Sequence, residues 1–542
     1  MLEGQKMTEQ NNKTKSARIR RFVGWTFNIF RLLFIVLLAL FMIICIYGQA
    51  PPKVLALMAI ILATLTIIPR RARKWIWLTF AIIVLGLIIW VFLPEDDSDW
   101  RPYTFDEELA TLEAKRAIPD DQNAATIYNQ LIKIYDVNDF KPDFMDDDLD
   151  YITRSGPWKS DECPQLAQWI TENNKTIETL LEASEKDQCR FPIYADLINL
   201  EKTFEYNIPV KYWSKLLVRA ANYDLGNGQI DRALRKQIAV LQIASHMYQQ
   251  MTMMDFLIAL AVEGIAIGQI NKSVINSELA ERHLSAIDKA IEEIDFNWSA
   301  DLPRILDYEK LFAKNFFGMY YQVNSEGKIR FLRNSSHIYP KRVQQPVTYW
   351  RKRLDRAWVI YYWFVLPTKP KTTGRILENE FSDYYEMSNP EYQWPTESPS
   401  FEDLMLKIPT YLTWMFWRQC KPQKAMYHIL YEHCLEAFAR RYAARMIIAL
   451  RRYKNEHGHW PKSLEDIKSL AHPELFIDSV NNDSFVYRLT DDGFTLYSKG
   501  ENNIDENGDR LTKKPDGTYT DDFLIWPPKN RKVKQEAKPE RN

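Results

Sequence analysis

Three apolar runs within the first 93 residues constrain the fold of this 542-residue chain more than any other feature. They cover residues 22–47, 54–68 and 75–93. A helix needs about 20 apolar residues to cross the hydrocarbon core of a bilayer, and the first and third runs meet that requirement. The second run would be only about 22 Å long as a helix. It spans if Lys53 snorkels and the bilayer thins slightly, and a re-entrant hairpin is the alternative.

The charges around these runs alternate, and the alternation predicts an orientation. Basic residues precede the first run (Lys13, Lys15, Arg18, Arg20, Arg21) and separate the second from the third (Arg70, Arg71, Arg73, Lys74), whereas acidic residues follow the third (Glu95, Asp96, Asp97, Asp99). Under the positive-inside rule, residues 1–21 are cytoplasmic, residues 22–93 form three transmembrane helices, and residues 94–542 are extracytoplasmic. We therefore expect a multi-pass protein of the inner (cytoplasmic) membrane. A cleaved signal peptide is the competing interpretation, but no small-residue cleavage site follows the first run.

The formal net charge of −1 supports this division. Residues 1–93 carry 12 Lys and Arg against 2 Asp and Glu, a net charge of +10, and the rest of the chain carries 58 against 69, a net of −11. Because the basic part is also the most apolar part, the pattern favours a lipid bilayer as partner and argues against nucleic-acid binding. The hydrophobic fraction of 46% excludes disorder as the main state.

The sequence predicts a mainly α fold: an N-terminal three-helix membrane anchor is followed, in the extracytoplasmic or outer part (residues 94–542), by helices and a small C-terminal α+β module. Residues 94–302 form an all-helical domain in this interpretation, with helices expected at 123–135, 164–185, 210–223, 230–251, 256–270 and 277–294. The helix at 256–270 is apolar almost all round, with Glu263 as its charged exception. Its 15 residues favour a buried core helix over a membrane span. The acidic stretch 139–150 is interpreted as a solvated loop.

Residues 303–424 form an aromatic-rich, irregular or helical region. Its Trp and Tyr residues favour either core filling under a long loop or a surface for a partner or a membrane. Four cysteines lie in the outer part: Cys163, Cys189, Cys420 and Cys434. An even number permits disulfides in an oxidising compartment, but pairing Cys163 with Cys189, or Cys420 with Cys434, along one helix is out of reach. Cross-pairing and free thiols both remain open.

Residues 425–527 predict a small α+β module. A long helix runs from about 425 to 456, and Gly458 follows it as a left-handed cap. Ser463 can cap a short helix over 464–470. Strands are expected at 485–489 and 494–498, joined by the turn Thr490–Gly493, and at 522–526. The basic tail, residues 528–542, is expected to be disordered.

Several residues of this module carry a resemblance. The run His457-Gly458-His459-Trp460-Pro461, the pair Phe485-x-Tyr487, and the run Gly493-Phe494-x-Leu496-Tyr497-Ser498-x-Gly500 resemble the C-terminal half of type II secretion major pseudopilins, over roughly 90 residues. The resemblance implies a helix, a small antiparallel sheet and a calcium loop. The same tail closes a group of large, uncharacterised bacterial membrane proteins that this chain resembles over most of its outer part. In a pilin the hydrophobic helix directly precedes the module. Here a large helical region intervenes, so we expect a grafted fold.

The loop after the second strand contains the expected calcium ligands. Asn503, Asp505 and Asn507, followed by Gly508, fit the Asx-x-Asx-x-Asx-Gly start of a calcium loop. Lys514 stands where such a loop has its bidentate Glu, so the site would need Asp509, Asp521 or Asp522 to complete it. Two interpretations are open: a Ca²⁺ site with Asn503, Asp505, Asn507 and Asp509 as ligands, and a solvated turn.

The sequence contains no Walker A, His-Glu-x-x-His, Gly-x-Ser-x-Gly or dinucleotide fingerprint. We therefore expect no evident catalytic site and a structural or protein-interaction role in the cell envelope, with envelope or secretion-system proteins as partners. The alternative is an enzyme with an unrecognised site in the helical domain, for which Glu201, His246 and Glu263 are the candidates. His428, Glu432 and Glu436 share a helical face with His433 beside them, and we interpret them as ordinary ion-pairing residues.

Overall fold

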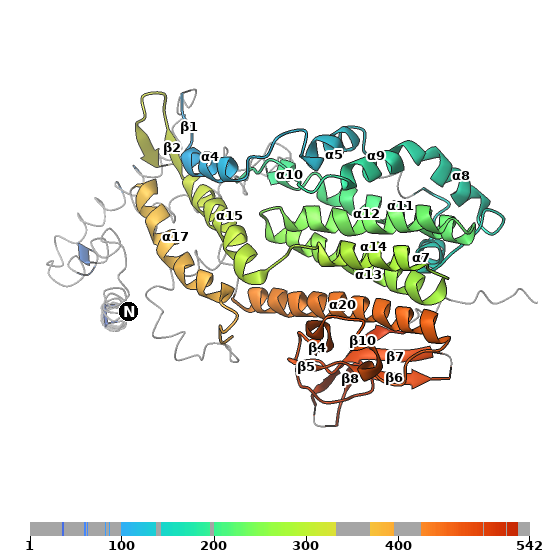
Figure 1. Cartoon of the computed structure of the whole chain (residues 1–542). Helices are drawn as coiled ribbons and strands as arrows, with labels where there is room; N and C mark the ends of the chain where they lie inside the picture. The colour runs from blue at the N-terminus through green and yellow to red at the C-terminus, as the bar shows by residue number, and fades with distance from the viewer. Residues whose placement is uncertain are drawn as a thin grey trace, which may run out of the picture. The chain divides into compact units, whose positions relative to one another are not determined.

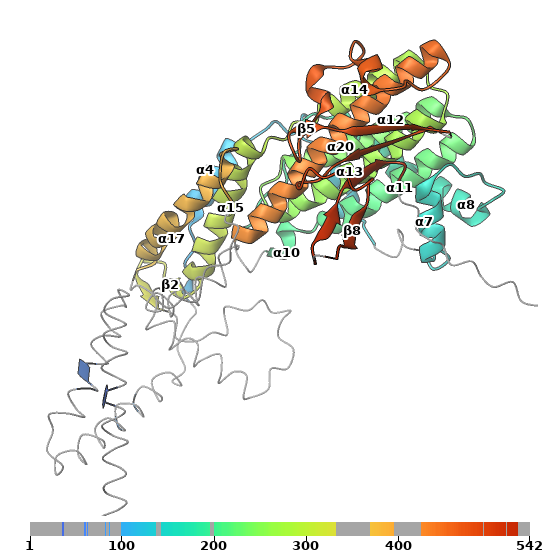
Figure 2. The same cartoon turned by 90° about the horizontal axis from the view of Figure 1, so that it is seen from below.

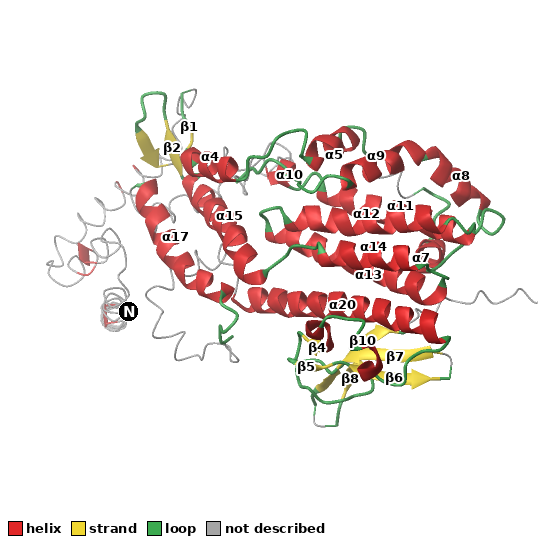
Figure 3. Cartoon of the chain, viewed as in Figure 1, coloured by secondary structure: helices red, strands yellow, loops and turns green. Residues whose placement is uncertain are grey.

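The computed structural model describes residues 99–136, 142–195, 200–331, 369–394 and 424–528 except 492 and 516, together with a few isolated residues between 35 and 86. About 59% of the described residues are helical, so the expected mainly α fold is confirmed at that level (Figure 3). The predicted membrane spans, the basic tail after residue 528, Cys420 and the aromatic clusters at 349–364 and 411–417 lie outside the described residues.

The chain divides into two compact units. The first comprises residues 1–105, 313–380 and 393–423, and the second comprises residues 106–312, 381–392 and 424–542. In the described part of the first unit, the short strands β1 (Arg101–Pro102), β2 (Tyr321–Val323) and β3 (Ile329–Phe331) form an antiparallel sheet in that order. The helices α15 (Trp298–Gly318) and α17 (Pro370–Tyr385) contribute residues to both units.

Buried polar contacts organise the first unit. The Lys314 ammonium lies 2.5 Å from a carboxylate oxygen of Glu378 and 5.5 Å from the centre of the Phe105 ring. The backbone N–H of Phe105 donates to the Asn315 side chain at 2.7 Å. An amide oxygen from α15 therefore fixes the chain segment that follows β1. The region expected to be irregular or helical contains α15, β2, β3 and α17 where it is described.

Residues 106–292 of the second unit form a helical layer, in which Figure 1 shows α11, α12, α13 and α14 side by side. The helices of this layer are α4 (Asp106–Lys115), α5 (Ala124–Ile132), α7 (Asp147–Ser155), α8 (Pro164–Glu172), α9 (Asn174–Ser184), α10 (Leu200–Thr203), α11 (Asn207–Gly226), α12 (Ile230–Tyr248), α13 (Met253–Asn276) and α14 (Glu281–Glu292). The helices expected at 210–223 and 230–251 are α11 and α12. These two helices and α13 pack against one another to form the core.

Polar side chains define where these helices begin. The side chain of Asn123 accepts a hydrogen bond from the backbone N–H of Ala125 at 3.0 Å and caps α5. At α13, Thr252 and Asp255 cap each other's backbone N–H groups in a capping box. Each such contact satisfies donors that the first turn of a helix leaves free. These residues therefore set the start of a helix that the hydrophobic pattern alone leaves uncertain.

Two expectations in this layer were wrong. The single helix expected over 164–185 is broken at Asn173 into α8 and α9, and the Asn173 side chain donates to the carbonyl of Trp169 at 2.9 Å. Asparagine competes with the helix through such local bonds. The acidic stretch 139–150 is not all loop, because Asp146 accepts from the N–H of Leu149 and caps α7. Acidic residues are favourable there because a helix N-terminus carries partial positive charge.

The helix α13 is long and apolar enough to cross a membrane by length and composition, the single such helix among the described residues. It packs against α12 and the C-terminal helix α20 (Lys424–His457), and its buried side chains include Phe256, Val262 and Ile270. This contact pattern agrees with the buried core helix expected there.

The helix α20 joins the helical layer to the strands of the C-terminal region. It packs along α13 and α14 on one side, and the strands lie on its other side (Figures 1 and 2). It ends where expected, because Gly458 follows with φ +78°. A left-handed residue at this position lets the last carbonyls of the helix find partners.

The strands of the C-terminal region are short and antiparallel. They are β4 (Ile477–Asp478), β5 (Asp483–Ser484), β6 (Val486–Thr490), β7 (Gly493–Ser498), β8 (Arg510–Lys513), β9 (Tyr519–Asp521) and β10 (Phe523–Trp526). One sheet has the order β10–β7–β6, and β4–β5 and β8–β9 form separate pairs. The predicted strands near 485–489, 494–498 and 522–526 are β6, β7 and β10. The expected helix at 464–470 is a 3₁₀ turn, Leu464–Ile467.

Contacts with α20 hold this strand layer in place. Glu436 of α20 accepts a hydrogen bond from Arg510 of β8 at 2.5 Å. The Arg440 guanidinium lies 4.6 Å from the centre of the Phe523 ring in β10. Ser479 donates to the carbonyl of Leu435 at 2.8 Å. An ion pair, a cation–π contact and a hydrogen bond therefore tie three parts of the strand layer to one helix.

Candidate metal centre

The loop between β7 and β8 is shaped by two glycines in the left-handed region. Gly500 has φ +65° and Gly508 has φ +76°. At Gly500 an added Cβ would lie only 2.4 Å from the carbonyl oxygen of Asp521. A residue with a side chain would therefore be strained at this position and would displace the Asp521 backbone. The close approach brings this loop against Asp521 and Asp522, the acidic pair where β9 ends and β10 follows.

Asp522 is the anchor of this loop. Its side chain is fully buried, and its Oδ2 accepts hydrogen bonds from the backbone N–H groups of Glu506 at 2.8 Å and Gly508 at 2.7 Å. Its Oδ1 is buried without a hydrogen-bond partner among the described residues. Buried carboxylate oxygens are almost always paired, so this oxygen marks a place where a further positive group fits.

Asp521 and Glu506 form an acidic cluster with Asp522. Asp521 Oδ2 accepts from the N–H of Asn502 at 3.1 Å, and Asp521 Oδ1 is likewise buried without a described partner. Glu506 accepts from the N–H of Asp521 at 2.6 Å. One oxygen from each carboxylate of Glu506, Asp521 and Asp522 lies within 4.8 Å of the other two. Three oxygens at this spacing could share one cation.

The electrostatics of the cluster are unbalanced. Burial raises the pKa of Asp522, and the nearby carboxylates of Glu506 and Asp505 raise it further. The pKa of Glu506 is lowered by its hydrogen bond with the Lys514 ammonium, which pairs with it. The Lys514 ammonium therefore offsets only part of the negative charge that the three carboxylates carry when ionised. A divalent cation would stabilise the ionised form of Asp522 that burial disfavours.

The four residues expected as ligands are held by other partners. Asp505 accepts from the Tyr497 hydroxyl at 2.7 Å and from Arg488 at 2.6 Å, and Asn507 accepts from Arg488 at 2.5 Å. The other two expected ligands contact different residues. Asn503 donates to Asp483 at 3.3 Å, and Asp509 accepts from Thr520 at 3.1 Å. The structure brings Asp505 and Asn507 together around a guanidinium.

The sequence found part of the cluster. Asp521 and Asp522 were two of the three residues named to complete the site, whereas Glu506 was missed because it falls between the alternating Asx positions. The signal that points to it is the Asp-Asp pair directly before a strand, facing a loop closed by Gly500 and Gly508. All-oxygen carboxylate sites suit hard cations such as Ca²⁺.

The other titratable candidates have structural partners. His428 lies 3.6 Å from Glu432, and Glu436 pairs with Arg440 and Arg510. These contacts are the ion pairs expected for this face of α20.

Glu263 forms a buried ion pair in the second unit. Arg441 of α20 donates from Nε to Oε1 at 2.6 Å and from Nη2 to Oε2 at 2.8 Å. The Tyr248 hydroxyl donates to the same carboxylate at 2.5 Å. All three side chains are buried. Because the two-point geometry satisfies both charges, Glu263 joins α13 to α20 and is not open to a substrate.

His246 belongs to a separate network. Its Nδ1 lies 2.9 Å from the Tyr128 hydroxyl, and its Nε2 lies 2.7 Å from the carbonyl oxygen of Lys186. Since a carbonyl only accepts, Nε2 carries the proton and Nδ1 accepts from Tyr128. Burial lowers the pKa of His246 to about 4. Glu201 is the second residue of the short helix α10, and its side chain lies outside the described residues.

A polar cleft of about 610 Å³ lies beside the C-terminal half of α12. Arg304, one of its lining residues, donates to the carbonyl oxygens of Tyr248 and Gln249, both at 2.6 Å. Those carbonyls end α12, so the guanidinium caps a helix C-terminus. Neither Glu263 nor His246 lines this cleft. The cysteines described near it and elsewhere, Cys163, Cys189 and Cys434, are free thiols.

Comparison with known proteins gives no relative: no family model, no curated protein and no solved structure matches this chain.

Proposed function

We propose that this protein is a membrane-anchored, extracytoplasmic component of the cell envelope with a structural or protein-interaction role. In this proposal the three N-terminal spans hold the chain in the inner membrane, and the helical layer is a scaffold. The region from α20 to β10 is a pseudopilin-like module that Ca²⁺ stabilises through Glu506, Asp521 and Asp522. The type II secretion pseudopilins are the family that the module resembles.

The observation that carries this proposal is the pair of buried carboxylate oxygens without partners, Asp521 Oδ1 and Asp522 Oδ1. Leaving a buried charged acceptor unpaired costs more than a lost neutral hydrogen bond. A bound cation removes that cost, and calcium accepts six to eight oxygen ligands in flexible geometry. Extracytoplasmic calcium modules commonly bind weakly, with Kd on the order of 10⁻⁴ to 10⁻³ M. The bound ion would fix the start of β10 against the preceding loop.

The scaffold role is supported by the way the interior charges are arranged. The Glu263–Arg441 pair links the helical layer to the module, and Arg445 and Arg452 of α20 add further pairs with Asp288 of α14, at 2.7 Å and 3.2 Å. Such contacts restrict the sliding of α20 along α13 and α14. A rigid module presented by a large helical base suits a protein that binds partners.

Calcium titration of the full chain in detergent tests the proposal. We expect millimolar CaCl₂ to raise the melting temperature, as ligand binding to the folded state requires, and EGTA to reverse the shift. Asp522→Asn should abolish the shift. Asp505→Asn is the matched control, because Asp505 lies in the same loop but pairs with Arg488 and Tyr497. Equal shifts in both variants, or no shift in the unaltered protein, would contradict the proposal.

A further inference from the structure

The polar cleft beside α12 shares no lining residue with the acidic cluster of the module. Its lining includes residues 187–189, residues 293 and 295 after α14, and Gln249, which follows the end of α12. All of these residues belong to the second unit. The volume of about 610 Å³ lies within the usual range for small-molecule sites, roughly 300–1,000 Å³.

The wall at residues 187–189 is fixed to α12 by side-chain amides. Gln249 accepts a hydrogen bond from the backbone N–H of Cys189 at 2.7 Å and donates to the carbonyl of Asp187 at 2.9 Å. Gln242 donates to the carbonyl of Lys186 at 3.2 Å. Because these contacts use backbone groups of the wall, the Asp187 carboxylate stays exposed at the cleft. The wall is therefore formed before any ligand binds.

Three exposed carboxylates line the cleft: Asp187, Glu293 and Asp295. Those of Asp187 and Asp295 accept no hydrogen bond and form no ion pair with the residues that the structure describes. Glu293 lies 3.5 Å from the Lys289 ammonium, and both side chains are more than half exposed. Exposed pairs of this kind contribute little. The rim of the cleft therefore carries negative charge for which the protein provides little compensation.

The two arginines of the cleft do not supply that compensation. Arg304, which caps α12, pairs with Asp301 at 2.7 Å. Arg116 pairs with Glu113 at 3.3 Å and donates to the Gln250 side chain at 3.1 Å. Each guanidinium has a carboxylate of its own, so an incoming anion would compete with that carboxylate. The charges that lack a partner are negative, and they favour a cationic ligand.

Ser245 of α12 gives an independent sign of a ligand. It is 7% exposed and lines the cleft. Its hydroxyl makes no hydrogen bond with the described residues and is not sealed from solvent, so it opens to the cleft. A hydroxyl on a helix commonly bonds to the carbonyl four residues earlier, as Ser214 and Thr153 do at 2.8 Å and 2.7 Å. The Ser245 hydroxyl remains able to accept from a donor in the cleft.

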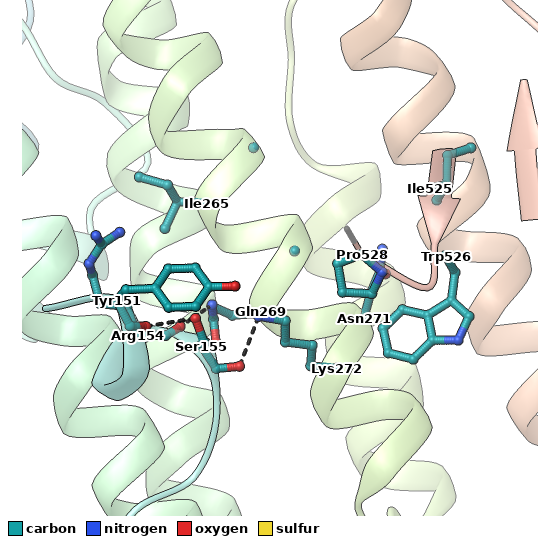
Figure 4. A pocket seen from close by; sticks show the side chains of 12 residues that line it. Tyr151, Arg154, Ser155, Ile265, Gln269, Asn271, Lys272, Ile525, Trp526 and Pro528 are labelled. Atoms are coloured by element: carbon teal, nitrogen blue, oxygen red, sulfur yellow. Dashed lines mark hydrogen bonds between the residues drawn. The ribbon is translucent and has the colours of Figure 1, made fainter. Parts of the chain in front are cut away.

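The smaller groove on α13, about 240 Å³ in volume, differs in this respect. Figure 4 shows Lys272 donating to the carbonyl of Ser155, at 2.8 Å, and Gln269 donating to the carbonyl of Arg154, at 2.6 Å. The Arg154 guanidinium pairs with Asp150. The charged groups of that groove have partners inside the protein, whereas the carboxylates of the polar cleft do not.

We propose that the polar cleft binds a linear polyamine, with ammonium groups at Asp187, Glu293 and Asp295 and an N–H donating to the Ser245 hydroxyl. A single metal ion does not fit, because among the described residues the acidic cluster of the module alone brings three ligand atoms within 4.8 Å of one another. A neutral sugar would leave the rim carboxylates uncompensated. A polyamine spaces its ammonium groups along a flexible chain, so separated carboxylates can each accept from one.

Isothermal titration calorimetry of the full chain in detergent, with spermidine as the probe, tests the proposal. The buffer contains EGTA, so that the result is independent of the calcium proposal and either proposal can fail alone. We expect saturable binding that weakens as NaCl is added, because salt screens exposed charges. Butylamine, which has a single ammonium group, should bind more weakly than spermidine. Spermidine should also raise the melting temperature.

Substitutions locate the binding site. Asp187→Asn and Asp295→Asn each remove one exposed charge and should weaken spermidine binding about two- to fivefold. Asp161→Asn is the matched control, because Asp161 is exposed in the same unit but does not line the cleft. Ser245→Ala should weaken binding about fivefold without lowering the melting temperature, since the hydroxyl has no partner in the protein and alanine favours a helix.

Diffuse attraction of a polycation to an acidic chain gives a different pattern. In that case Asp161→Asn and Asp295→Asn would change the affinity equally, and Ser245→Ala would leave it unchanged. Either result would overturn the proposal, as would the absence of saturable binding in the unaltered chain. Displacement of spermidine by an equal concentration of Mg²⁺ would show that a metal ion is the better ligand and would also contradict it.

Discussion

At the scale of single residues, burial decides what each titratable group does. His246, named from the sequence as a catalytic candidate, is fully buried between Tyr128 and Lys186. Glu263, the charged exception in an apolar helix, is buried as half of an ion pair. Both side chains have their hydrogen-bond and charge partners inside the protein. A polar residue in an apolar stretch therefore predicted a buried partner better than it predicted catalysis.

The lowered pKa of His246 makes the stability of the protein depend on pH. A histidine that folds in its neutral form stabilises the protein fully above its unfolded pKa of about 6.5, and that stability is lost as the pH falls toward its folded pKa of about 4. We expect the unfolding free energy to fall by about 1–3 kcal/mol from this group over that interval. Urea unfolding of the protein and of His246→Gln at several pH values measures it. The stability difference between the two should shrink on acidification, and parallel curves would refute the assignment.

At the scale of elements, the contact between α13 and α20 depends on a buried pair of opposite charges. Glu263→Gln leaves the Arg441 guanidinium buried without its carboxylate, and we expect a loss of about 3–5 kcal/mol of unfolding free energy. Arg441→Met leaves Glu263 buried and should cost a similar amount. The variant with both Glu263→Gln and Arg441→Met buries no charge, so its loss should be well below the sum of the single losses. Denaturant unfolding gives all three values, and additive losses would show that the two side chains act independently.

Some of these elements could be predicted from the sequence, and others could not. Hydrophobic periodicity predicted α11, α12, α13, α20 and the β6–β7 pair, because local pattern decides such segments. It missed the break at Asn173, which depends on one side chain bonding to Trp169. It gave no partner for Glu263, since Arg441 lies 178 residues away and only packing brings them together. For the acidic cluster, the sequence indicated Asp521 and Asp522 but not Glu506. The alternating Asx pattern pointed instead to Asp505 and Asn507, which the structure pairs with Arg488.

At the scale of the whole molecule, the proposed function depends on where the second unit resides. The charge division, +10 in residues 1–93 and −11 in the rest, predicts that the helical layer and the module face away from the cytoplasm. The calcium proposal assumes that the module meets millimolar calcium on that side of the membrane.

Reporter fusions measure that placement most directly. Alkaline phosphatase requires disulfides and is active only in an oxidising compartment, whereas green fluorescent protein exported in unfolded form stays dark. We expect fusions after residue 528 to give phosphatase activity without fluorescence, and fusions between residues 70 and 74 to give fluorescence without phosphatase activity. Fluorescence with no phosphatase activity from the fusion after residue 528 would place the helical layer and the acidic cluster in the cytoplasm and contradict the account.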